Sequence, residues 1–219
     1  MDIFDIIGPI MIGPSSSHTA GAVRIGKVCR KILGEKPVRA EIAMAGSFAR
    51  TYKGHGTDKA IIAGILGMGP GDERVRRSLE IAADEGLDYA FTEVRLPRAH
   101  PNTAVIHLVD GHGAECTVQG ASVGGGNILI TKLNQIDTDF SGRHDTLIIP
   151  HKDVPGTIAA VTALVADSHK NIGNFRLSRP TRGYQAVMTI EIDGTMEPDL
   201  VSKLKQLPNV INVVYLPAN

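Results

Sequence analysis

The sequence has few aromatic residues and no net charge, and both features exclude common kinds of partner. Only 4% of its 219 residues are aromatic and none is tryptophan, which disfavours a surface that stacks nucleic-acid bases. Lysine plus arginine number 23, and so do aspartate plus glutamate, so no general attraction to nucleic acid or to a membrane surface is expected. We therefore expect neither nucleic acid nor a membrane as a partner.

The sequence also shows no pattern typical of a signal peptide or a membrane-spanning segment. The start of the chain, with Asp2 and Asp5 and a short apolar stretch, lacks the basic beginning and long apolar core of a signal peptide. No apolar run approaches the ~20 residues that cross a membrane. A cytoplasmic protein is the expectation.

Cysteine is scarce, and the two cysteines present do not form a metal site by their spacing. Cys29 falls on the apolar stripe of an expected helix and Cys116 in an expected strand, so both are predicted to be buried thiols. Two well-separated thiols cannot hold an iron–sulfur cluster, which needs about four ligands. The expectation is that this chain holds no metal.

What the sequence does contain is an ordinary globular composition, with 42% apolar residues. A polar stretch at 135–145 predicts a linker between a domain at 1–134 and a second domain at 146–219. Apolar periodicity predicts an α+β sandwich for the first domain. Its expected helices run from about Ile25 to Leu33, Asp58 to Leu66 and Asp72 to Glu85, and its expected strands are Val38–Ala43, Val94–Leu96, Thr103–Val109 and Glu115–Val118.

The second domain has the clearer pattern, strand-helix-strand-strand-helix-strand, which is the ferredoxin-like βαββαβ motif. Its expected elements are Thr146–Ile149, Gly156–Ser168, Asn171–Ser178, Gln185–Asp193, Pro198–Gln206 and Val210–Leu216. The α+β class is therefore predicted for both domains.

Two short motifs in this half resemble the ACT domain of regulators of amino-acid metabolism. Asp153-Val154-Pro155-Gly156 precedes the first helix, and Asn171-Ile172-Gly173 leads into the second strand. The resemblance implies that Asp153, Pro155, Gly156, Asn171 and Ile172 contact an amino-acid effector, and that the domain mediates self-association. The alternative is that these residues only begin a helix and a strand.

In the first half, Gly13–Thr19 reads Gly-Pro-Ser-Ser-Ser-His-Thr before a helical pattern. Hydroxyl and backbone donors at the start of a helix can surround a small carboxylate or phosphate. The alternative is a helix cap, which serine supplies readily.

Three histidines, His18, His55 and His100, lie in expected loops flanked by glycine, proline or serine. A histidine in such a place can act as a general base, an anion donor or a metal ligand. His55 is the strongest candidate, because glycines on both sides let a backbone approach another molecule closely. Each can also be an ordinary exposed or capping histidine, and their spacing does not support a shared metal.

The order of Gly13–Thr19, Lys53–Lys59, Arg98–Asn102 and Gly120–Gly126 resembles the iron–sulfur-dependent L-serine dehydratases. With an ACT-like half behind it, the chain resembles the β subunit of the two-chain form. The first domain also resembles the allosteric substrate-binding domain of some phosphoglycerate dehydrogenases. The resemblance implies that a separate α subunit supplies the cysteines of a [4Fe–4S] cluster.

The same resemblance implies conversion of L-serine to pyruvate and ammonia. His55 or His100 is then the base at the substrate Cα, with His55 preferred, while the serine-rich turn holds the substrate carboxylate or a second effector. The residues implied for that turn are Ser15, Ser16, Ser17, His18 and Thr19. Two other functions remain open at this point: an amino-acid- or anion-sensing module without catalysis, and a self-contained lyase with a metal at the three histidines.

Overall fold

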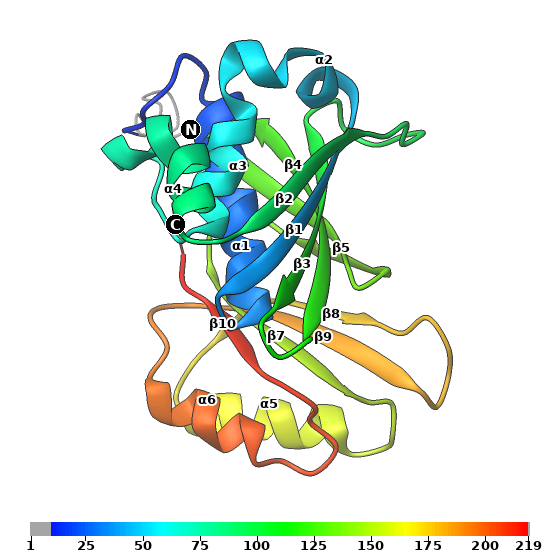
Figure 1. The fold of residues 1–219 in the computed structure, drawn as a ribbon. Helices are drawn as coiled ribbons and strands as arrows, with labels where there is room; N and C mark the ends of the chain where they lie inside the picture. The colour runs from blue at the N-terminus through cyan, green and yellow to red at the C-terminus, as the bar shows by residue number, and fades with distance from the viewer. Residues whose placement is uncertain (1–9, 219) are drawn as a thin grey trace. The chain divides into compact units, whose positions relative to one another are not determined.

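The computed structural model describes residues 10–218, and the chain divides into two compact units, Met1–Gln135 and Ile136–Asn219. Asp2 and Asp5, on which the signal-peptide argument rests, lie outside the described residues. Both units combine helices with sheets, so the α+β class is confirmed (Figure 1). Within residues 10–218, no helix is long and apolar enough to cross a membrane.

The first unit is built on a sheet whose strands run in the order β2-β1-β3-β4-β5. β2 is parallel to β1, and the other neighbours are antiparallel. Alternate residues of β1, among them Ala40 and Ile42, are fully buried, as expected of a strand with one face on the core. The bounds are β1 Pro37–Met44, β2 Asp88–Glu93, β3 Thr103–Asp110, β4 Glu115–Gly124 and β5 Asn127–Leu133.

Helices α1 and α3 pack side by side in this unit (Figure 1). Glycines make the contact close: a Cβ at Gly26 would lie 2.4 Å from the Ile61 carbonyl oxygen, and one at Gly64 would lie 2.0 Å from that of Val23. The helical segments are the π-helical turn η2 Ser17–Gly21, α1 Ala22–Leu33, α2 Gly46–His55, α3 Thr57–Ile65, the 3-10 turn η3 Glu73–Arg77 and α4 Ser78–Asp84.

Several elements of this unit differ from the sequence prediction. Helix α2 was expected as a loop, but Phe48 is fully buried and the Pro101 carbonyl accepts the Ser47 N–H at 2.7 Å, so tertiary contacts stabilise the helix. The strand expected at 94–96 lies at 88–93, where it pairs with β1. The expected helix at 72–85 begins as the 3-10 turn η3, and β5 had not been expected.

In the second unit, the elements follow the predicted order and the sheet order is β10-β7-β9-β8, with antiparallel neighbours. Figure 1 shows α5 and α6 on one side of this sheet. The core between them includes Leu147, Ile190, Val161 and Leu200, all buried. The bounds are β7 Asp145–Lys152, α5 Thr157–Asp167, β8 Ile172–Ser178, β9 Gln185–Ile192, α6 Pro198–Lys205 and β10 Val214–Leu216.

The stretch expected as a linker, 135–145, contains strand β6, Ile136–Phe140. Thr138 and Phe140 alternate inward: the Thr138 hydroxyl lies 3.1 Å from that of Thr189, and Phe140 is 2% exposed. Asp145 is buried as well, and its carboxylate accepts the Ala218 N–H at 2.7 Å and the Tyr215 hydroxyl. The polar side chains of this stretch form hydrogen bonds inside the unit. Its polar composition therefore reflects buried hydrogen bonds and not a solvent-exposed linker.

Candidate functional site

A pocket of about 660 Å³ opens in the first unit where four segments meet. The segments are the loop before η2, the end of α2, the start of α3 and the turn η3. We call it the cationic pocket. Its polar and glycine lining includes Gly13, Thr19, Lys53, His55, Lys59 and Arg76.

The charge of this pocket is positive. Lys53, Lys59 and Arg76 line it, and among the described residues that do so there is no carboxylate. None of the three forms an ion pair within residues 10–218; the Lys53 ammonium lies 5.7 Å from the centre of the Tyr52 ring. Unpaired cations around a concave surface favour an anionic ligand group such as a carboxylate.

His55 reaches the pocket because two helices meet at Gly56. His55 is the last residue of α2, and Gly56 ends that helix and precedes α3 with φ of +68°. Only glycine adopts this left-handed conformation without strain. The result is an exposed imidazole at the rim of the pocket, beside the start of α3.

His18 lies behind His55, with ring centres 4.8 Å apart, and is buried. The Thr51 hydroxyl donates its proton to the Ser47 carbonyl at 2.8 Å. Its oxygen also lies 3.2 Å from His18 Nε2, and because its only proton is already used, it accepts a hydrogen bond there. Nε2 then carries the ring proton, and Nδ1 accepts from the Ser15 hydroxyl at 3.3 Å. Burial, and then repulsion from His55, lower the pKa of His18, which favours this neutral form.

The serine-rich turn is only partly directed at the pocket. Of the five residues expected to hold a carboxylate, Thr19 lines the cationic pocket. Ser15 instead bonds the ring and the backbone N–H of His18, and the Ser16 carbonyl accepts the Gly21 N–H at 3.0 Å. The helix-cap alternative holds for Ser15, whose hydroxyl oxygen accepts the His18 backbone N–H three residues on at 3.4 Å, whereas Ser16 makes no side-chain capping bond.

The structure does not bring His100 into the same pocket as His55. His100 lines a separate pocket of about 490 Å³ at the start of α2, whereas His55 lies at the end of that helix. A helix of this length spans roughly 14 Å. Residues 10–218 contain no group of three histidine, cysteine, aspartate or glutamate side chains placed to hold a metal ion. The three-histidine metal site is therefore not formed.

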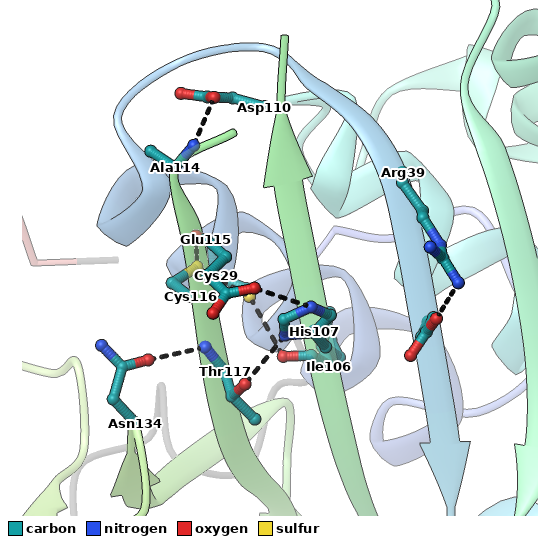
Figure 2. A network of polar contacts seen from close by, with 11 residues as sticks. Cys29, Arg39, Ile106, His107, Asp110, Ala114, Glu115, Cys116, Thr117 and Asn134 are labelled. Carbon is teal, nitrogen blue, oxygen red and sulfur yellow. Dashed lines mark hydrogen bonds and ion pairs between the residues drawn. The ribbon is translucent and has the colours of Figure 1, made fainter. Parts of the chain in front are cut away.

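Both cysteines are buried, as predicted (Figure 2). Their sulfur atoms lie 3.8 Å apart between α1 and β4, and burial raises the pKa of the Cys29 thiol. Each thiol donates to a backbone carbonyl, Cys29 to Ile106 and Cys116 to Cys29. Two enclosed thiols without further ligands do not fit an iron–sulfur cluster.

In the second unit, the residues implied as effector contacts lie at opposite ends of the sheet. Asp153 follows the end of β7 that pairs with Gln185, while Ile172 pairs with Ile192 at the other end. Asp153 accepts the Gly183 N–H at 2.8 Å and the Arg179 guanidinium at 2.7 Å, and both hold the pKa of its carboxyl below the usual value.

The other implied effector contacts are also occupied or exposed. The Asn171 amide donates to Asp193 at 2.9 Å, and Gly156, with φ of +90°, precedes α5 beside exposed Pro155. Within one chain these residues do not form a single site.

Several residues of the site were missed by sequence reasoning. Arg76 lies in the run Glu-Arg-Val-Arg-Arg of η3, which reads as an ordinary solvated surface. Ser47 and Thr51 contact His18 because they share one face of α2, at a spacing of four residues. That spacing was readable only once α2 was known to be a helix.

The fold and the site define a two-unit α+β protein whose first unit offers a cationic pocket beside a histidine pair. The family model for the serine dehydratase beta chain matches residues 1–78. The chain is 46% identical over 214 residues to the probable L-serine dehydratase beta chain of Bacillus subtilis, covering 98% of this chain and 97% of that one. It therefore belongs to the L-serine dehydratase beta-chain family.

Two further relatives show how far the similarity extends. The L-serine dehydratase beta chain of Peptoniphilus asaccharolyticus is 39% identical over 214 residues, which cover 97% of this chain and 96% of that one. A D-3-phosphoglycerate dehydrogenase of Bacillus subtilis is 22% identical over 198 residues, covering 88% of this chain and 36% of its own length.

Proposed function

We propose that this chain is the β subunit of a two-chain L-serine ammonia-lyase and contributes the base and a carboxylate-binding pocket to a shared site. The reaction removes the Cα proton and the β-hydroxyl of L-serine as water and leaves aminoacrylate. Its imine tautomer adds water and loses ammonia to give pyruvate. A base at Cα and donors that hold the carboxylate are the parts that this chain offers.

The observation that carries the proposal is the position of His55. Its exposed imidazole lies at the rim of a pocket lined by Lys53, Lys59 and Arg76, and its ring is 4.8 Å from that of His18. A carboxylate held by these cations leaves the neighbouring Cα within reach of a side chain at the rim. A neutral imidazole near pH 7 suits proton abstraction there.

In this proposal His18 packs behind His55 and does not contact the substrate. Both of its ring nitrogens contact hydroxyl groups of the chain, at 3.2 Å for Thr51 and 3.3 Å for Ser15. Ser15 acts through His18, and Thr19 is the hydroxyl-bearing residue of the serine-rich turn that lines the pocket. The base is His55 alone, because His100 lines a different pocket.

We further propose that the [4Fe–4S] cluster is held by the α subunit. The support from this chain is negative: its two thiols are enclosed between α1 and β4 and are bonded to backbone carbonyls. Held by the partner, such a cluster would supply a Lewis acid for the β-hydroxyl group.

Mixing the chain with its partner tests this proposal. The purified chain alone is expected to form no pyruvate from L-serine, and activity is expected to appear when a cysteine-bearing α subunit with its cluster is added. The measurement is pyruvate release in a coupled assay. Turnover by the isolated chain, or a fully active α subunit without it, would contradict the proposal.

For the second unit we propose an ACT domain that mediates self-association and binds an amino-acid effector between two copies. The element order and the strand order β10-β7-β9-β8 support it. β8 lies at the end of that order, and Phe175 on β8 is 37% exposed. If two β8 strands pair antiparallel, Asn171 of one copy approaches Asp153 of the other, which one chain alone cannot achieve.

Replacing Phe175 with aspartate is expected to weaken this self-association by about tenfold, because each protomer loses burial of the exposed 37% of the phenylalanine and gains an unpaired charge at the interface. Analytical ultracentrifugation of the full chain measures it. Ile211→Asp is the control, since Ile211 is 49% exposed and follows α6 rather than lying on β8. An unchanged association constant for Phe175→Asp would rule out the β8 interface.

A further inference from the structure

His55 packs against a second imidazole, which the chain holds in one orientation. The ring centres of His55 and His18 lie 4.8 Å apart with the ring planes at 90°, so the edge of one ring meets the face of the other. His55 ends α2 and is exposed, whereas His18 lies in η2 and is 8% exposed. The buried ring therefore restricts the movement of the exposed one.

One face of α2 carries both His55 and the groups that surround His18. Ser47, Thr51 and His55 follow one another at intervals of four residues, so their side chains lie along the same face of the helix. Thr51 Oγ1 lies 3.2 Å and Ser47 Oγ 3.5 Å from His18 Nε2. The Phe48 ring also contacts His18, with ring centres 5.3 Å apart. The same helix thus positions the exposed imidazole and encloses the buried one.

Both ring nitrogens of His18 are used within this enclosure. Nε2–H donates to Thr51, whose own proton goes to the Ser47 carbonyl, and Nδ1 accepts from the Ser15 hydroxyl. The Ser15 oxygen in turn accepts the His18 backbone N–H at 3.4 Å. Neither nitrogen is left to bond His55, so His18 acts on His55 through ring packing and not by taking its proton.

Thr51 is the member of this enclosure on which the orientation of the His18 ring most depends. Water does not readily replace its hydroxyl, because His18 is buried, and a buried N–H without an acceptor is costly. Ser47 is more distant from Nε2, at 3.5 Å. Removing the Thr51 hydroxyl therefore favours a rotated ring or the tautomer in which Nδ1 carries the proton. Either change alters the surface against which His55 packs.

We propose that Thr51 and His18 are positioning residues for His55. Thr51 fixes the tautomer and orientation of the His18 ring, and that ring fixes the orientation of the His55 imidazole at the rim of the cationic pocket. The inference rests on the proposed function, in which His55 is the base, because a base removes a proton efficiently only when its lone pair points at that proton. Neither Thr51 nor His18 contacts the substrate in this arrangement.

The first test uses the full chain alone, with ¹⁵N-labelled histidine, and reads the ring tautomers from long-range ¹H–¹⁵N spectra at alkaline pH. Wild-type His18 is expected to show the Nε2–H tautomer. Thr51→Val, which keeps the side-chain shape, is expected to change the His18 tautomer population and to shift the His55 ring signals. Thr51→Ser, which keeps the hydroxyl, should leave both close to those of the wild type. Because neither an α subunit nor turnover is needed, failure of the proposed function would not alter this result.

The second test measures steady-state pyruvate release from the assembled two-chain enzyme. Thr51→Val is expected to lower kcat by about 10- to 100-fold, the size of effect that a displaced reacting group produces, with KM within a factor of about two. Thr51→Ser should restore most of kcat. Thr117→Val is the matched control: Thr117 Oγ1 lies 3.0 Å from His107 Nδ1, and neither residue of this pair lines the cationic pocket (Figure 2). Its replacement should leave kcat unchanged.

The proposal would be overturned by an Nδ1–H tautomer of His18 in the wild type or by unchanged His55 signals in Thr51→Val. Normal kcat in Thr51→Val, or an equal loss of kcat in Thr51→Val and Thr51→Ser, would overturn it as well. An inactive wild-type complex would contradict the proposed function instead, and the spectra of the isolated chain would still decide whether Thr51 positions His55.

Discussion

On the proposed two-chain function with His55 as the base, replacing His55 with glutamine is expected to lower kcat by about 10²- to 10⁴-fold, the range that a general base contributes. Glutamine keeps a polar side chain of similar length but cannot accept a proton near neutral pH. His55 is exposed in this chain, so its replacement should leave the fold intact. Steady-state pyruvate release from the two-chain complex measures the effect.

His112→Gln is the control for this experiment. His112 is an exposed histidine of the same unit in the turn between β3 and β4, and it does not line the cationic pocket. Its replacement should leave kcat within a factor of about two. Near-normal turnover by His55→Gln, with the cluster absorbance retained, would exclude His55 as the base.

Replacing Gly64 with alanine is expected to lower the free energy of unfolding by about 3 kcal/mol, at the upper end of typical overpacking effects. A Cβ at this position would lie 2.0 Å from the Val23 carbonyl oxygen, and backbone atoms of a packed helix have little room to move. The thermal midpoint should fall by about 10 °C. Calorimetry of the full chain measures both.

The same substitution should weaken ligand binding in the cationic pocket. α1 follows the turn that carries Thr19, and α3 carries Lys59, so separating the two helices moves these two lining residues relative to each other. Gly69→Ala is the control, because a Cβ there meets nothing within 4 Å. Equal stability of Gly64→Ala and Gly69→Ala would show that the close approach of α1 and α3 is not required.

The second unit could be predicted from sequence more fully than the first. Its strands and helices follow one another with clear periodicity, and residues such as Leu147 and Ile190 are buried as their alternation suggests. In the first unit, α2 could not be predicted, since Gly46, Ser47 and Gly54 have low helix propensity. The helix is instead stabilised by tertiary contacts: Phe48 is buried, and the Pro101 carbonyl accepts the Ser47 N–H.

By itself, the sequence determined the α+β class and the two buried thiols. These follow from local periodicity and residue type, which are properties of neighbouring residues. Only the tertiary structure decided that His18 lies behind His55, that Arg76 joins the cationic pocket and that His100 belongs to another pocket. Such relations join residues far apart in the chain, and they exist only after helices and strands have packed together.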